Sequence, residues 1–215
     1  MILTVLFSFF LASEPHTIGI IVFDDVLTSE ITAPAEVFGM AIKEPELKGW
    51  QVQLISVNDH LTVRTAEGLK IQADLLLSQA GNVDVLIVPG AYETEDLRKH
   101  AALIAFIQKQ PGWIASNCSG AFILGQSGVL DGRRATTWPG GEPDLQRLFP
   151  KVQVQSQVSL VVDGQRLTTN GGLVSYEGAF VLLAHLSNRK VTQKVFEMLN
   201  GQRRLSWEEL VKFLP

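Results

Sequence analysis

A single cysteine, Cys118, carries the strongest chemical signal in this sequence. The apolar run Trp113–Asn117 precedes it and the helical run Ala121–Gln126 follows it, so the cysteine falls where a strand turns into a helix. The small residues Ser116 and Gly120 stand two positions before and after it, where larger side chains would clash. This pattern is typical of a nucleophile elbow, in which a thiolate attacks an electrophilic carbon.

The start of a helix also suits a nucleophile. Its partial positive charge and free N–H groups favour a thiolate, and they predict a lowered pKa for Cys118. The backbone N–H of Ser119 would point toward a developing oxyanion, and the loop at Gly90 and Ala91 would supply a second donor. The alternative is a buried structural cysteine, since free cysteines are among the most buried residues.

A cysteine nucleophile commonly has a histidine base. The chain has four histidines, none of them next to the cysteine in sequence: His16, His60, His100 and His185. They fall before a predicted strand, in a turn and on helices, and no pair has the spacing of a metal site. We therefore predict neither a metal nor another cofactor.

Three carboxylates follow the first predicted strand, at the edge of the sheet where sites form. Asp24 and Asp25 have the residue type and position of turn and capping residues. Glu30 stands among Ile31, Ala33 and Val37, which would draw its side chain inward. Burial would raise the pKa of such a carboxyl, and the protonated acid would donate to a thiolate. Spacing alone does not choose among the three acids.

Alternating strands and helices must position these residues. The predicted strands are Thr17–Phe23, Gln51–Val57, Val83–Val88, Trp113–Asn117, Gly132–Trp138, Val152–Val162 and Arg166–Thr169, with a short hairpin of Leu61–Thr65 and Leu69–Ala73. The predicted helices are Thr32–Ile42 with Pro34 in its first turn, Thr94–Gln110, Ala121–Gln126, Asp144–Phe149, Leu173–Leu186 and Val191–Leu199. This order predicts an α/β fold with a doubly wound, mostly parallel sheet and helices on both faces.

Composition excludes several classes of protein. The 215 residues are 46% hydrophobic and 19% charged, which excludes a disordered chain and suits one domain with a large core. The net charge is −4 and there is no Lys/Arg block, so we expect no nucleic acid partner. A single cysteine excludes an internal disulfide framework and a cysteine-based zinc site.

The chain divides into three segments. Residues 1–16 begin with an apolar, uncharged run of 12 residues that suits a signal peptide or a membrane anchor. No basic residue precedes this run, and Phe10 is too bulky for a good cleavage site, so a buried first strand is the alternative. We expect export to the periplasm, or membrane association through residues 1–12, rather than a cytoplasmic protein. Residues 17–200 form the α/β domain and residues 201–215 a tail.

Four blocks, in order, resemble the ThiJ/PfpI superfamily of class I glutamine-amidotransferase-like proteins. They are IGIIVFDDVLTSEITAPAEVF, VDVLIVPGA, SNCSGAFILGQSGVLDGRRATTWP and TTNGGLVSYEGAF. The resemblance implies a flavodoxin-like sandwich that forms a homodimer. It also implies that Cys118 is the nucleophile, that Glu30 is the acid that meets its sulfur, and that Gly90 and Ser119 are backbone oxyanion donors.

The sequence is most similar to the branch with isonitrile hydratases and the sensor domains of AraC-type regulators. In those hydratases a catalytic threonine follows the cysteine, and Ser119 keeps a hydroxyl there; their acid is an aspartate, one methylene shorter than Glu30. Many relatives carry a histidine where this chain has Trp138, which cannot act as a base. We therefore expect no peptidase activity, and a pocket lined by Trp138, Asn117 and Ala91.

These observations predict a cysteine-dependent hydratase or hydrolase that acts on a small electrophile. Cys118 attacks, Glu30 shuttles a proton, and Ser119 and Gly90 hold the anion. The alternative is a non-catalytic protein of the same fold that senses oxidants or a small ligand, because a stabilised thiolate oxidises readily.

Overall fold

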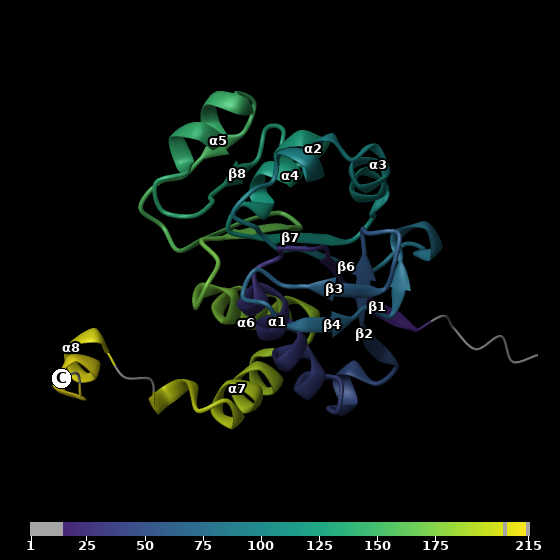
Figure 1. The fold of residues 1–215 in the computed structure, drawn as a ribbon. Helices are drawn as coiled ribbons and strands as arrows, with labels where there is room; N and C mark the ends of the chain where they lie inside the picture. The colour runs from purple at the N-terminus through teal and green to yellow at the C-terminus, as the bar shows by residue number, and fades with distance from the viewer. Residues whose placement is uncertain (1–14, 204–205, 214–215) are drawn as a thin grey trace, which may run out of the picture.

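A seven-stranded sheet forms the centre of the computed structural model, which describes residues 15–203 and 206–213 (Figure 1). From one edge to the other its strands are β10 (Leu160–Asp163), β11 (Arg166–Thr169), β7 (Trp113–Asn117), β6 (Val85–Val88), β1 (His16–Val22), β2 (Trp50–Ser56) and β5 (Leu75–Leu76). All neighbours are parallel except the β10–β11 hairpin. The central strands are apolar runs buried on both faces, as parallel sheets require.

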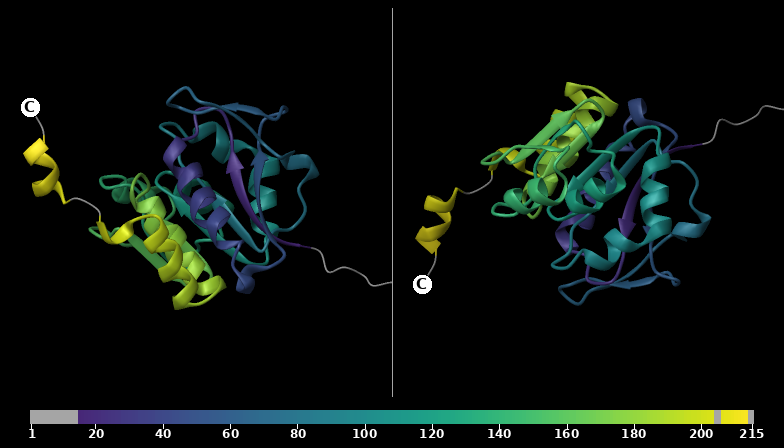
Figure 2. Two further views of the ribbon diagram at one scale, coloured as in Figure 1. Left: turned by 90° about the horizontal axis from the view of Figure 1, so that it is seen from below. Right: turned by 90° about the horizontal axis from the view of Figure 1, so that it is seen from above.

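Helices cover both faces of this sheet (Figures 1 and 2). One face carries α1 (Thr28–Ala41), α6 (Val174–Leu186) and α7 (Arg189–Met198), and the other carries α2 (Glu95–Lys99), α3 (Ala101–Lys109) and α4 (Gly120–Ser127), with α5 (Glu142–Leu148) packed beyond α4. The tail holds the short helix α8 (Trp207–Leu210), and single 3-10 turns occupy 45–47, 77–79, 201–203 and 211–213. The predicted doubly wound, flavodoxin-like α/β fold is confirmed.

Two small sheets lie outside the central one. The predicted hairpin forms as β3 (Thr62–Arg64) and β4 (Lys70–Gln72), while β8 (Arg134–Ala135) pairs in parallel with β9 (Gln153–Val154). The predicted strand Gly132–Trp138 is thus wrong beyond two residues. The predicted strand Val152–Val162 is interrupted between β9 and β10, where Gln157 has a left-handed φ of 60°.

Two predicted helices also need correction. The helix predicted over Thr94–Gln110 breaks into α2 and α3 at His100, whose extended backbone (ψ 94°) ends one helix. Its ring Nδ1 accepts the N–H of Leu103 and so caps the next helix. Helix α1 begins at Thr28, four residues earlier than predicted, so Pro34 lies inside the helix and not in its first turn.

The carboxyl ends of four adjacent strands, β11, β7, β6 and β1, meet at one edge of the sheet. After β1 the chain crosses to β2 on one side and later returns to β6 on the other, which makes β1–β6 the switch point of the fold. The loops that follow these four strands therefore converge on one place.

The predicted signal peptide or anchor falls on residues 1–14, outside the described residues. None of the helices in the described ranges is long and apolar enough to cross a membrane.

Candidate active site

Cys118 lies in the sharp turn between β7 and α4 with φ 48°, a left-handed conformation that strains a residue with a Cβ. Hydrogen bonds hold this turn on both sides. The Cys118 N–H donates to the Thr169 carbonyl at 3.0 Å, and the Thr137 hydroxyl donates to the Cys118 carbonyl at 2.8 Å. The elbow predicted from the flanking small residues is therefore present and firmly held.

Gly120 shows why the turn requires small residues. A Cβ at this position would come within 2.2 Å of the Val88 carbonyl oxygen, because α4 begins directly against the end of β6. Ser116, on the other side of the cysteine, is completely buried. The backbone of the elbow can therefore approach its neighbouring strand only with residues of this size.

Glu30 is the acid that the fold brings to Cys118. Its side chain is fully buried in the first turn of α1 and is hydrogen-bonded to the cysteine side chain. The Gly90 N–H donates to Glu30 Oε2 at 2.6 Å and the Gly172 N–H donates to Oε1 at 3.4 Å. Burial outweighs these bonds and raises the pKa of Glu30 to about 7. The carboxyl can therefore both release and accept a proton near neutral pH.

Pro34 and Asn117 support the same segment of α1. Because Pro34 has no N–H, the Glu30 carbonyl lacks the usual helical donor four residues on. Asn117 Nδ2 donates to this carbonyl at 3.4 Å, and Asn117 Oδ1 accepts from Thr169 Oγ1 at 2.7 Å. Asn117 thus lies behind the elbow and not along the cavity, contrary to the predicted lining.

Asp24 and Asp25 serve the neighbouring β3–β4 hairpin. Asp24 Oδ1 accepts the Arg64 N–H at 2.8 Å, and the Asp25 N–H donates to the Arg64 carbonyl at the same distance. Asp25 has a φ of 65°, which suits a tight turn. Of the three candidate acids, only Glu30 reaches the cysteine.

The prediction of a lowered pKa for Cys118 needs correction. Burial first, and the negative charge of Glu30 second, raise the pKa of Cys118 to about 12, although the N–H and hydroxyl of Ser119 act in the opposite direction. The resting thiol is therefore neutral, and a partner must remove its proton when the sulfur reacts. Glu30, with its pKa near 7, is hydrogen-bonded to the thiol and suited to that task.

Of the two backbone N–H groups predicted to hold an oxyanion, that of Gly90 has another acceptor and that of Ser119 faces the cysteine. Gly90 gives its N–H to Glu30, so it positions the acid instead of standing free for an anion. The Ser119 N–H does face the cysteine sulfur. The Ser119 hydroxyl donates to the Ala91 carbonyl at 2.6 Å and accepts the Ala91 N–H at 2.9 Å, which fastens the loop after β6 to the elbow.

All four histidines lie elsewhere. His16 pairs with Asp84, His60 contacts the Thr62 carbonyl, and His100 caps α3. The His185 ring packs against Trp113, with centroids 4.7 Å apart. None of them lines the cavity beside Cys118. In the described part of the chain, no three His, Cys, Asp or Glu side chains are grouped to hold a metal ion.

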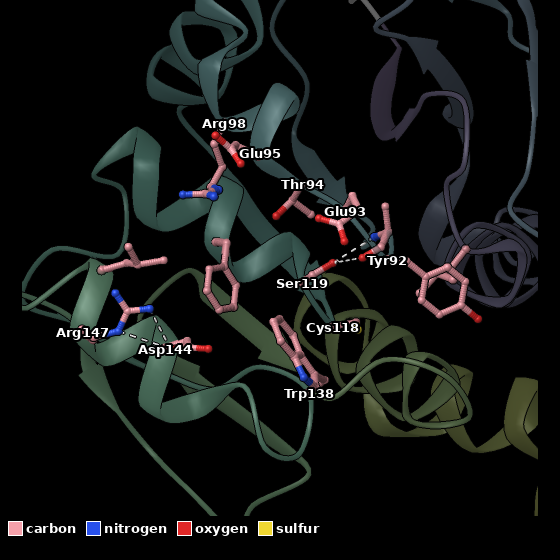
Figure 3. A pocket seen from close by; sticks show the side chains of 14 residues that line it. Tyr92, Glu93, Thr94, Glu95, Arg98, Cys118, Ser119, Trp138, Asp144 and Arg147 are labelled. Atoms are coloured by element: carbon pink, nitrogen blue, oxygen red, sulfur yellow. Dashed lines mark hydrogen bonds and ion pairs between the residues drawn. The ribbon is translucent and has the colours of Figure 1, made fainter.

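A cavity of about 440 Å³ opens over Cys118 and Ser119 (Figure 3). Trp138 and Phe122 form one wall, with their rings stacked at 4.9 Å. Trp138 and Ala91 both line this cavity. The other lining residues are Leu27, Tyr92, Glu93, Thr94, Glu95, Arg98, Asp144, Arg147 and Leu148.

Sequence reasoning missed several residues of the site. Gly171 follows β11, and a Cβ there would lie 2.2 Å from Glu30 Oε1 and 2.5 Å from the Cys118 Cβ. The Gly171-Gly172 pair after an apolar strand was a signal that could have placed this loop at the site. Phe122 was visible as the residue one helical turn beyond the cysteine. The residues from α2 and α5 gave no local signal.

Comparison with known proteins gives a family match. The model of the DJ-1/PfpI family matches residues 16–184. The isonitrile hydratase of Pseudomonas putida is 28% identical over 182 residues, which cover 83% of this chain and 75% of that protein. The HTH-type transcriptional regulator GbdR of Pseudomonas aeruginosa is 24% identical over 88% of this chain, and the match spans about half of the regulator, 52% of its length.

Solved structures share the fold. A THiJ/PfpI family protein from Pseudomonas syringae matches with a TM-score of 0.78 at 22% identity, covering 90% of this chain and 78% of that one. DJ-1beta of Drosophila melanogaster matches with a TM-score of 0.77 at 22% identity, covering 86% and 97%. At these identities the likeness concerns the fold alone.

Proposed function

The chain belongs to the DJ-1/PfpI family, and from that premise we propose that it is a cysteine-dependent hydratase or hydrolase of small electrophiles. The observation that carries the proposal is the buried contact between the Glu30 carboxyl and the Cys118 thiol, with the pKa of Glu30 raised to about 7. A general acid–base group works best when its pKa lies near the working pH. The similarity to an isonitrile hydratase supports this class of substrate.

In the proposed reaction the sulfur of Cys118 bonds to the electrophilic carbon while the thiol proton passes to Glu30. Glu30 then returns that proton to the substrate. For an isonitrile, the proton goes to the terminal carbon and a thioimidate forms on the sulfur. Water adds to the same carbon, the C–S bond breaks, and the thiol regains a proton, so that the net change is addition of water to give a formamide. Developing negative charge near the sulfur meets the Ser119 N–H.

Turnover by matched variants tests this proposal. The substrates are an alkyl isonitrile, a small aldehyde and an activated ester. We expect Cys118→Ser to fall to background and Glu30→Gln to lose about 100-fold or more, the usual contribution of a general acid–base. Glu36→Gln, on the exposed side of the same helix, should keep wild-type rates. Turnover that survives Cys118→Ser, or no turnover of any substrate by the wild type, contradicts the proposal.

One observation favours a second candidate, a non-catalytic sensor. The thiol is neutral at rest, and Trp138 occupies the position where many relatives have a histidine, so in the described part of the chain no histidine assists Glu30, the base that contacts the thiol. The similarity to the regulator GbdR agrees with this candidate. Saturable binding of a small molecule without turnover would favour a ligand sensor. Oxidation of Cys118 by micromolar peroxide, seen by mass spectrometry, would favour a redox sensor and would contradict the raised pKa of the thiol, because a neutral thiol oxidises slowly.

We also propose that the protein works as a homodimer, because members of this family are often homodimers. Its apolar first 12 residues lead us to propose export. Light scattering of the purified protein tests the first proposal. Cell fractionation with N-terminal sequencing of the mature chain tests the second.

A further inference from the structure

Not all of the charged side chains that line the cavity over Cys118 have an ion-pair partner. Five charged side chains line it: Glu93, Glu95, Arg98, Asp144 and Arg147. Arg147 pairs with Asp144 at 2.8 Å, and Glu95 pairs with Lys99. Glu93 is exposed, so solvent screens its charge. Arg98 is therefore the partly buried cation of this cavity that has no ion pair among the described residues.

The guanidinium of Arg98 has a buried N–H group without a hydrogen-bond acceptor. Its Nε is covered from solvent and makes no hydrogen bond. A covered guanidinium N–H without an acceptor is unfavourable, because it has lost water without gaining a replacement. Glu95 forms its ion pair with Lys99, four residues further along the helix. Its interaction with Arg98 is electrostatic and does not include an ion pair. The Nη groups of Arg98 are not covered in this way, and a carboxylate in the cavity would meet them with its two oxygens in the geometry that a guanidinium matches best.

Arg98 and Cys118 occupy separate parts of the cavity (Figure 3). The Trp138 ring lies on the same cavity wall and is stacked on Phe122, so a flat apolar group would find an aromatic surface there. A volume of about 440 Å³ accommodates a small molecule that has a carboxylate for Arg98, a flat apolar group for Trp138 and an electrophilic carbon for Cys118. Arg98 also borders a second, more polar hollow beside Gln108 and Gln126.

We propose that this cavity selects anionic electrophiles: small aromatic or unsaturated carboxylates whose carboxylate binds Arg98 and whose electrophilic carbon lies at Cys118. This inference rests on the proposed function, because it names the substrate class of the same site. Arg98 is then a specificity-determining residue that recognises the end of the substrate remote from the reacting carbon.

Equilibrium binding provides the first test. The probes are 4-methylbenzoate, its neutral analogue 4-methylbenzamide and inorganic phosphate, measured by calorimetry on the full chain. We expect the benzoate to bind more tightly than the benzamide, and Arg98→Gln to weaken benzoate binding about tenfold or more while changing benzamide binding less than twofold. Arg189→Gln removes an exposed cation of α7 outside this cavity and should change benzoate binding less than threefold. Stronger binding of phosphate than of benzoate would overturn the carboxylate assignment.

Covalent labelling separates this inference from the proposed function. The probes 4-(bromomethyl)benzoate and 4-(bromomethyl)benzamide carry the same reactive group, and the chain has one cysteine to report on them. We expect the benzoate to label Cys118 faster than the benzamide, with this advantage lost in Arg98→Gln and kept in Arg189→Gln, whose exposed side chain lies outside the cavity. Equal labelling by both probes overturns the inference and leaves the nucleophile intact. Benzoate binding through Arg98 with no labelling by either probe supports the anion site and refutes the proposed function.

Discussion

The buried carboxyl of Glu30 makes a quantitative prediction about stability and pH. In the unfolded chain its pKa is 4.5, and burial in the folded protein raises the pKa to about 7. Between these values the folded protein keeps a proton that the unfolded chain has lost. Raising the pH therefore favours unfolding, so the stability that the protonated carboxyl supports is complete below pH 4.5 and is lost as the pH rises through 7.

The size of the effect follows from the shift. A pKa shift from 4.5 to about 7 corresponds to about 3 kcal/mol of unfolding free energy. About 2 kcal/mol of this falls between pH 5.5 and pH 8, where proteins are easily handled. The thiol of Cys118, with its pKa raised to about 12, stays protonated over this range and adds nothing to the slope.

Urea unfolding followed by tryptophan fluorescence at pH 5.5, 6.5, 7.2 and 8.0 measures the effect. Glu30→Gln keeps the shape of the side chain and cannot ionise, so its stability should decline with pH by about 2 kcal/mol less than that of the wild type. Glu36→Gln removes an exposed carboxylate from the same helix and should follow the wild-type curve. Equal slopes in the wild type and Glu30→Gln would refute the claim that Glu30 is buried with a raised pKa.

Three further predictions concern the elbow. Alkylation of Cys118 should have a pH midpoint above the value of about 8.5 of a free thiol, and Glu30→Gln should lower it because a negative charge beside the sulfur is gone; a wild-type midpoint below 8.5 would contradict this. Gly171→Ala should destabilise the fold by about 2 kcal/mol or more and abolish labelling of Cys118, whereas Gly172→Ala, whose new Cβ meets no atom within 4 Å, should show only the milder cost of a positive φ in both measurements. Thr137→Val should lower the unfolding free energy in urea by about 0.5–1.5 kcal/mol, since the Cys118 carbonyl loses its hydroxyl donor and keeps only the Ala121 N–H at 3.3 Å; an unchanged value would show that the hydroxyl bond does not hold the elbow.

Local patterns were sufficient to predict the central strands of the sheet and the place of the cysteine. The runs Thr17–Phe23 and Val83–Val88 are short, apolar and rich in β-branched residues, which is typical of buried strands, and they correspond to β1 and β6. The elbow was visible because a strand, a cysteine and a helix follow one another without interruption. In each case the physical cause lies within about ten residues of sequence.

Features that depend on distant contacts were not predictable in the same way. Helix breaking at His100 depends on how the chain after β6 must turn to reach α3. The N–H of Gly90 has Glu30, 60 residues away, as its acceptor. The resemblance implied that this N–H holds an oxyanion, whereas the packing of α1 against the loop after β6 directs it to Glu30.

The pKa of Cys118 is set by tertiary contacts that outweigh the local effect of the helix start. The start of a helix stabilises a negative charge by typically 0.3–1 kcal/mol, which is less than one pKa unit. Removal of the sulfur from water and the charge on Glu30 act in the opposite direction and together raise the pKa to about 12. Both effects exist only after α1 has packed over the elbow. The same packing holds the pKa of Glu30 at about 7. The folded protein therefore has a neutral thiol with a base within hydrogen-bond distance, and not a permanently charged thiolate.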